Sequence, residues 1–206
     1  MSFRGTSAEG LDAVLGELHT ALTGGADAAS VGAELFAVAG VLRSEPALRR
    51  IATDMSVATG AKQTLATEIF GGKVSEATLG LLRTALGRRW TATRDLADAL
   101  EHVGVVAVVR SADADSARLA DELFGFGQVV SGSPELRDAL SDRARSAADK
   151  GTLLHSLLDG KALAATVTLA EQALQGSYRT VGAALAAFQQ VAADVHEQKI
   201  ATVHVA

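Results

Sequence analysis

The chain has 206 residues, a formal net charge of −5 and no cysteine. Without cysteine there is no disulfide or thiolate chemistry, and a reducing compartment is the default expectation. An acidic chain whose basic residues are scattered is not expected to bind nucleic acid. No apolar run approaches the roughly 20 residues that span a bilayer, and the first ten residues lack the apolar core of a secretory signal, so direct membrane insertion is not expected.

The composition favours helices. Ala and Leu, which lose little conformational freedom in a helix, are abundant, whereas aromatic residues make up 4% of the chain and there are two prolines. The first helix is predicted from about Ala8 to Leu22, because Leu11, Val14 and Leu18 recur on one side. These observations predict an all-α fold.

A stretch of forty residues occurs twice in the chain. Residues 34–73 and 122–161, which lie 88 positions apart, agree at thirteen of the forty positions when they are aligned without a gap. Chance agreement in an Ala- and Leu-rich chain would be about one position in ten. The two prolines, Pro46 and Pro134, also coincide. The repeat predicts an internal duplication and two tandem helical bundles.

Each copy carries an apolar stripe with helical spacing, so both stripes are predicted to be buried. The stripe of the first copy is Val31, Leu35, Val38 and Leu42, and that of the second is Leu119, Leu123, Phe126 and Val130.

Helix boundaries are also repeated. Ser133 before Pro134 is typical of an N-cap followed by the first helical residue, and the first copy has a weaker version at Pro46. Gly72 and Gly160, each followed by a lysine, are predicted to end a helix in each copy.

The last helix of each half is long. Residues 91–110 are predicted to form a helix that links the halves, although five valines between positions 103 and 109 leave a strand as the alternative. The alternating, β-branched segment 200–206 is predicted to be a strand. The expected domains are a first bundle over residues 1–110 and a second over residues 111–206, which shares helix 91–110 and carries the terminal strand.

No residue pattern predicts catalysis, a cofactor or a metal. Gly71-Gly72-Lys73 lacks the first glycine and the hydroxyl residue of a phosphate loop, and it is better explained as a helix stop. The five histidines never lie three or four positions apart, so no helix face presents a metal pair. Asp113 and Asp115 lack the glycine and closing glutamate of a calcium loop.

The order of these motifs resembles the delta subunit of bacterial F-type ATP synthase, the family of the oligomycin sensitivity conferring protein. The resemblance rests on the ordered motifs of both copies and on the tail: Pro134-Glu135-Leu136-Arg137, Lys150, Gly160-Lys161 and Ala201-Thr202-Val203-His204-Val205-Ala206, with Pro46, Leu48, Arg49, Lys62, Gly72 and Lys73 in the first copy. The doubled unit is similar to the long delta subunits of actinobacteria, in which an extra bundle precedes the usual one.

The resemblance implies two six-helix-type bundles and a non-catalytic peripheral-stalk, or stator, subunit that links the alpha/beta catalytic head to the stalk. Its implied partners are the N-terminal helices of the alpha subunits and the b subunit, at the cytoplasmic face of the cell membrane. The family continues past the tail into a small α/β region, so the C-terminal region is expected to be truncated here. The alternative is a freestanding helical adaptor unrelated to ATP synthase.

A subunit that binds helices needs an apolar seam that its own helices leave open. The residues predicted to line this partner-helix groove are Leu96, Leu100 and Val103, together with Leu169 or Leu174.

Overall fold

The computed structural model describes residues 3–142 and 144–205, and the described backbone is built from helices with no strand. The all-α prediction is confirmed. None of the described helices is long and apolar enough to cross a membrane.

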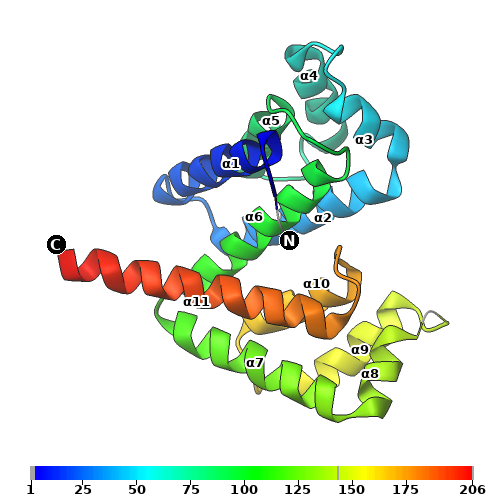
Figure 1. Ribbon diagram of the computed structural model, residues 1–206, viewed down its shortest axis with the longest axis vertical. Coiled ribbons are helices and arrows are strands. Elements are labelled where there is room, and N and C mark those ends of the chain that lie inside the picture. The colour runs from blue at the N-terminus through cyan, green and yellow to red at the C-terminus, as the bar shows by residue number, and fades with distance from the viewer. Residues whose placement is uncertain (1–2, 143, 206) are drawn as a thin grey trace. The chain divides into compact units, whose positions relative to one another are not determined.

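The chain forms two compact units that divide between Ala107 and Val108, inside helix α6. The first half contains α1 (Thr6–Thr23), α2 (Ala28–Ser44), α3 (Pro46–Thr53), α4 (Thr59–Phe70), α5 (Glu76–Leu86) and α6 (Asp95–Ser111) (Figure 1). The second contains the short 3-10 helix η1 (Asp113–Asp115), α7 (Ser116–Gly132), α8 (Pro134–Ser141), α9 (Ala147–Leu158), α10 (Ala164–Gln175) and α11 (Val181–Val205).

The helix bounds repeat along the chain. Helices α7, α8 and α9 begin and end 88 residues after α2, α3 and α4, and α10 begins 88 residues after α5. A duplication would produce this correspondence, and the common origin of the two halves stays an inference from it.

Both predicted apolar stripes are buried, as expected from their spacing. Every member is at most 6% exposed, and Leu35, Leu119 and Leu123 are fully buried. In the second unit α11 packs along α7 in the opposite direction, and α10 packs against both α9 and α11 (Figure 1). In the first unit α5 packs against α1 and α4. The stripes are therefore part of the cores of their units.

Local sequence signals set several helix ends. The Ser133 hydroxyl accepts a hydrogen bond from the Leu136 amide, with Pro134 in the first turn, as the sequence predicts. After α4 and α9 the chain turns at Gly72 and Gly160, whose φ angles of 73° and 70° lie in the left-handed region that glycine tolerates best. Both predicted stops are confirmed.

The predicted C-terminal strand is wrong. Residues 200–205 continue α11 to Val205, whereas Ala206 lies outside the described residues. The described chain offers no strand to pair with this segment, and a helix satisfies backbone amides and carbonyls within the segment itself. The valine-rich run of residues 103–109 is likewise helical, within α6. In both segments the hydrogen-bonding requirement outweighs the β propensity of the residues.

Candidate partner-binding surface

The predicted groove residues lie in two different units. Leu96, Leu100 and Val103 are on α6 in the first unit, and each is 0% exposed. Leu169 on α10 is also fully buried, whereas Leu174 on the same helix is half-buried. The groove as a whole stays a prediction. Because Leu100 is a core residue, its replacement by aspartate would unfold the unit and could not serve as a binding probe.

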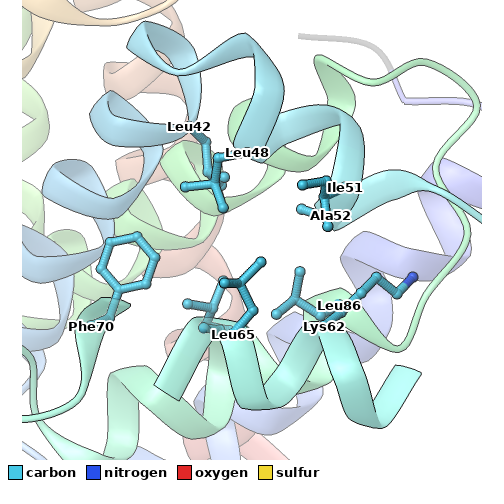
Figure 2. A pocket seen from close by; sticks show the side chains of 10 residues that line it. Leu42, Leu48, Ile51, Ala52, Lys62, Leu65, Phe70 and Leu86 are labelled. Atoms are coloured by element: carbon cyan, nitrogen blue, oxygen red, sulfur yellow. The ribbon is translucent and has the colours of Figure 1, made fainter. Parts of the chain in front are cut away.

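An apolar pocket lies in the first unit between α3 and α4. Figure 2 shows Leu48, Ile51 and Ala52 of α3 facing Leu65 and Lys62 of α4 across it. Its complete lining is Leu42, Leu48, Ile51, Ala52, Lys62, Leu65, Ala66, Phe70, Leu82 and Leu86. Nine of these ten residues are apolar, so the pocket suits an apolar side chain.

The exception is Lys62, whose side chain reaches the edge of the pocket. The residue is 6% exposed, and its ammonium donates a 3.3 Å hydrogen bond to the backbone carbonyl of Asp54. Its aliphatic stem lies along the apolar wall, while the nitrogen points away from the centre (Figure 2). The pocket is therefore apolar inside with a cation at its rim.

The second unit has an apolar hollow at a different place, between α7 and α9. It is lined by Glu122, Phe126, Val129, Leu157, Leu158, Lys161, Ala162 and Thr166. Val129 in this lining and Phe124 on the same helix are each 54% exposed. Sequence reasoning predicted neither hollow, because each one depends on how several helices pack together.

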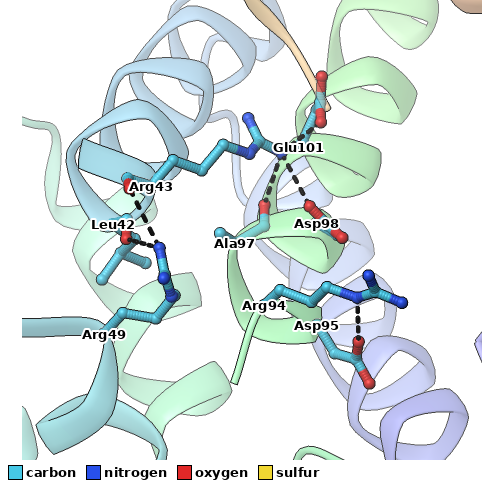
Figure 3. Close-up of polar contacts among 8 residues, drawn as sticks. All are labelled: Leu42, Arg43, Arg49, Arg94, Asp95, Ala97, Asp98 and Glu101. Carbon is cyan, nitrogen blue, oxygen red and sulfur yellow. Dashed lines mark hydrogen bonds and ion pairs between the residues drawn. The ribbon is translucent and has the colours of Figure 1, made fainter. Parts of the chain in front are cut away.

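A buried ion cluster joins α2 to α6 in the first unit. The Arg43 guanidinium donates to the carboxylates of Asp98, at 3.2 Å, and of Glu101, and to the carbonyl of Ala97 at 3.5 Å (Figure 3). The Glu101 side chain is 0% exposed. Burial raises the pKa of Asp98 above its usual value, although Arg43 favours the charged form. Arg49 closes the nearby end of α2 by donating to the carbonyls of Leu42 and Arg43.

A half-buried carboxylate caps α5 in the first unit, and another caps its counterpart α10 in the second. Glu34 accepts hydrogen bonds from the Ser75 amide at 3.0 Å and from the hydroxyls of Ser75 and Thr78, at 2.6 and 2.5 Å. In the second unit Glu122 accepts from the Leu163 amide at 2.8 Å and from the Thr166 hydroxyl at 2.5 Å. Each carboxylate thus ties α2 or α7 to the start of another helix.

The pKa values of both carboxyl groups are lowered. Burial is the largest single influence and acts in the other direction, but the hydrogen bonds from Ser75 and Thr78 together lower the pKa of Glu34 below its usual 4.5. The hydrogen bonds from Thr166 and Leu163 do the same for Glu122. A carboxyl group with a depressed pKa stabilises the fold above its unfolded pKa, and this contribution is lost as the pH falls through the folded value.

We expect Glu34→Gln to cost the first unit about 1–2 kcal/mol at pH 7, because a neutral amide replaces a charged acceptor of three hydrogen bonds. The cost should shrink below pH 4.5 as the wild-type carboxyl protonates. Urea unfolding followed by the fluorescence of Trp90, the single tryptophan, would measure it. A cost that is constant between pH 3 and pH 7 would contradict the capping role.

His155 bridges α9 and α10 in the second unit. Its Nδ1 lies 2.9 Å from the Asp159 carboxylate and its Nε2 lies 2.8 Å from the Glu171 carboxylate. The bridge borders a groove that also contains Leu174, one of the predicted groove residues. The hydrogen bonds to Asp159 and then Glu171 raise the pKa of His155 above its usual 6.5.

We expect the second unit to lose a small part of its stability as the pH rises through the raised pKa of His155. A group whose pKa is raised on folding contributes fully below its unfolded pKa of 6.5, and the contribution disappears once the folded group deprotonates. The difference in melting temperature between wild type and His155→Thr should therefore be largest below pH 6.5. A difference that grows between pH 6.5 and pH 9 would contradict the bridge.

The described residues contain no group of three or more His, Cys, Asp or Glu side chains that could hold a metal ion. The hollows are bordered by apolar side chains with isolated charges, which suits the binding of another chain better than chemistry on a small molecule. The fold thus defines the class of two-unit helical proteins.

Comparison with known proteins identifies the family, although no protein-family model matches the chain. A protein from a Nocardioides strain is 49% identical over 210 residues, covering 100% of this chain and 75% of its own length. A relative from Nocardia farcinica is 42% identical and covers 92% of this chain and 71% of its own length. A relative from Thermobifida fusca is 38% identical and covers 98% of this chain and 76% of its own length. All three are named ATP synthase subunit delta.

The chain belongs to the ATP synthase delta subunit family, whose members are non-catalytic subunits of the peripheral stalk. The family resemblance predicted from the ordered motifs is confirmed. The alternative, a freestanding adaptor unrelated to ATP synthase, is not supported.

Proposed function

We propose that this chain is a stator protein that ties the catalytic head of ATP synthase to its peripheral stalk, resisting the torque that accompanies proton-driven ATP synthesis. Its partners would be the N-terminal helices of the alpha subunits and the b subunit of the stalk, at the cytoplasmic face of the membrane. The observation that carries this proposal is the 49% identity to a delta subunit over the whole chain.

The structure supports helix binding as the mechanism. Each unit has a rigid core of buried leucines and leaves an apolar hollow on its surface, in the first unit between α3 and α4 and in the second between α7 and α9. An amphipathic helix binds such a surface by inserting side chains spaced three or four residues apart. We also propose that α6 is shared by two bundle domains, with a boundary near residue 110.

Calorimetry with a synthetic peptide of the alpha-subunit N-terminus from the same organism tests the proposal. The peptide should bind the full chain saturably. A control peptide with serines in place of its apolar stripe should give no binding heat. Equal behaviour of the two peptides, or no heat from either one, would reject helix capture as the mechanism.

A further inference from the structure

Two large apolar side chains are exposed near the end of α3 in the first unit. Ile51, which lines the pocket, is 42% exposed, and Met55, four residues further on, is 58% exposed. Leu48 and Leu65 extend this surface and are half-buried. We call Leu48, Ile51 and Leu65 around the pocket, together with the exposed Met55 that follows α3, the α3–α4 face. Contiguous apolar surface of this kind commonly marks an interaction site.

The second unit has larger side chains at two of the corresponding positions. Residues 138–140 of α8 are Asp-Ala-Leu where residues 50–52 of α3 are Arg-Ile-Ala. Leu140 is 2% exposed, and Leu154 on α9, which corresponds to Ala66 in the pocket lining, is 0% exposed. Two alanines of the first unit thus correspond to buried leucines in the second. The exposed isoleucine and the two small side chains of the pocket lining are therefore not required by the helix arrangement.

Helix α3, which forms one wall of the pocket, carries positive charge. Helix α3 contains Arg49 and Arg50 and no acidic residue. Within the described part of the chain, neither the exposed Arg50 nor Lys62 at the pocket edge forms an ion pair. The nearby Asp54 carboxylate accepts from the Ser56 amide and hydroxyl at 2.8 and 2.7 Å. Lys62 is buried and lies near Asp54, so the exposed Arg50 is the cation that favours a partner with carboxylates.

We propose that the α3–α4 face docks an acidic amphipathic helix of a partner protein, whose apolar side chains cover Ile51 and Met55 and whose carboxylates lie beside the exposed Arg50. This proposal rests on the helix-binding function proposed above and adds the charge and the place of one such helix. The α3–α4 face contains none of the residues of the partner-helix groove predicted from the sequence. In the second unit the position of Arg50 is taken by Asp138 and that of Ile51 by Ala139, so that unit would repel the same helix. The two units therefore differ in the helix they select.

Methyl NMR of the full chain tests this directly. The probes are two designed 16-residue peptides with the same leucine stripe, one flanked by glutamates and the other by lysines. The chain has two methionines, so Met55 gives one of only two methionine methyl signals. We expect the glutamate peptide to shift the methyl signals of Met55 and Ile51 and to bind about tenfold more tightly than the lysine peptide.

Substitutions copied from the second unit provide the matched variants. The double variant that combines Arg50→Asp and Ile51→Ala should bind the glutamate peptide at least tenfold more weakly. Its Trp90 fluorescence should still report a folded first unit. Ala52→Leu should fill the pocket, raise the melting temperature and weaken binding. Equal affinity of the two peptides, binding unchanged in Arg50→Asp with Ile51→Ala, or methyl shifts confined to the second unit would each overturn the proposal. The proposal would also be overturned if the free chain self-associates and thereby buries Met55.

Discussion

Arg43→Ala should destabilise the first unit by about 3 kcal/mol, because it leaves the fully buried carboxylate of Glu101 without its guanidinium partner. This free-energy cost lies at the low end of the range for breaking a buried ion pair. The Arg43 side chain is 23% exposed, so in the variant water can partly replace the guanidinium. Urea unfolding followed by Trp90 fluorescence reports on this unit, because the indole lies within it and donates to the Ala85 carbonyl at 3.0 Å.

Arg50→Ala is the matched control for this prediction. Arg50 is an exposed arginine nearby in the same unit, and among the described residues it makes no ion pair. Its removal should change the free energy of unfolding by no more than about 0.5 kcal/mol. If both substitutions cost the same, the ion cluster would not be a determinant of how α2 packs on α6.

Gly104→Leu should cost the first unit about 2–3 kcal/mol by forcing α2 and α6 apart. A Cβ atom at Gly104 would lie 2.7 Å from Phe36 Cε1 and 3.2 Å from the carbonyl oxygen of Gly32. The phenylalanine ring could move only by giving up its own packing, and the carbonyl belongs to the backbone of α2. Helix α6 therefore needs glycine at this crossing despite the lower helix propensity of glycine.

Gly40→Leu tests whether the cost comes from this crossing. Gly40 lies on α2 in the same unit, and a Cβ atom there would meet nothing within 4 Å. The substitution should stabilise the unit slightly, by up to about 0.8 kcal/mol, because leucine is the better helix former. Thermal unfolding of both variants should thus show shifts of opposite sign. A loss of equal size at Gly40 would remove the steric explanation.

Local features of this fold were accessible from the sequence, whereas contacts between distant segments were not. The stripe from Val31 to Leu42, the cap at Ser133 and the stops at Gly72 and Gly160 each depend on neighbours within about one or two helical turns. The ion cluster depends on residues far apart, since Arg43 meets Glu101 across 58 positions. The sequence signal for this cluster was Glu101, a glutamate inside the valine- and alanine-rich stretch of α6. A buried charge requires a partner, so its presence there indicated an ion pair.

The tail shows the limit of local patterns. Alternation and β-branched residues in segment 200–206 favour a strand, but a strand also requires a neighbour with which to pair. Continuation of α11 needs no neighbour, and the described backbone is helical to Val205. The candidate surface was missed for a related reason. Ile51 and Ala52 differ from Ala139 and Leu140 by ordinary apolar exchanges, whose effect on the pocket is visible only once α3 and α4 are seen together (Figure 2).

Cosedimentation with the catalytic head of ATP synthase tests the stator role most directly. The full chain would be mixed with purified heads from the same organism that lack a delta subunit, and separated on a density gradient. We expect the chain to move with intact heads and to remain at the top of the gradient when the N-terminal helices of the alpha subunits have been removed. Failure to move with intact heads, or equal binding to heads without these helices, would contradict the proposed link between head and stalk.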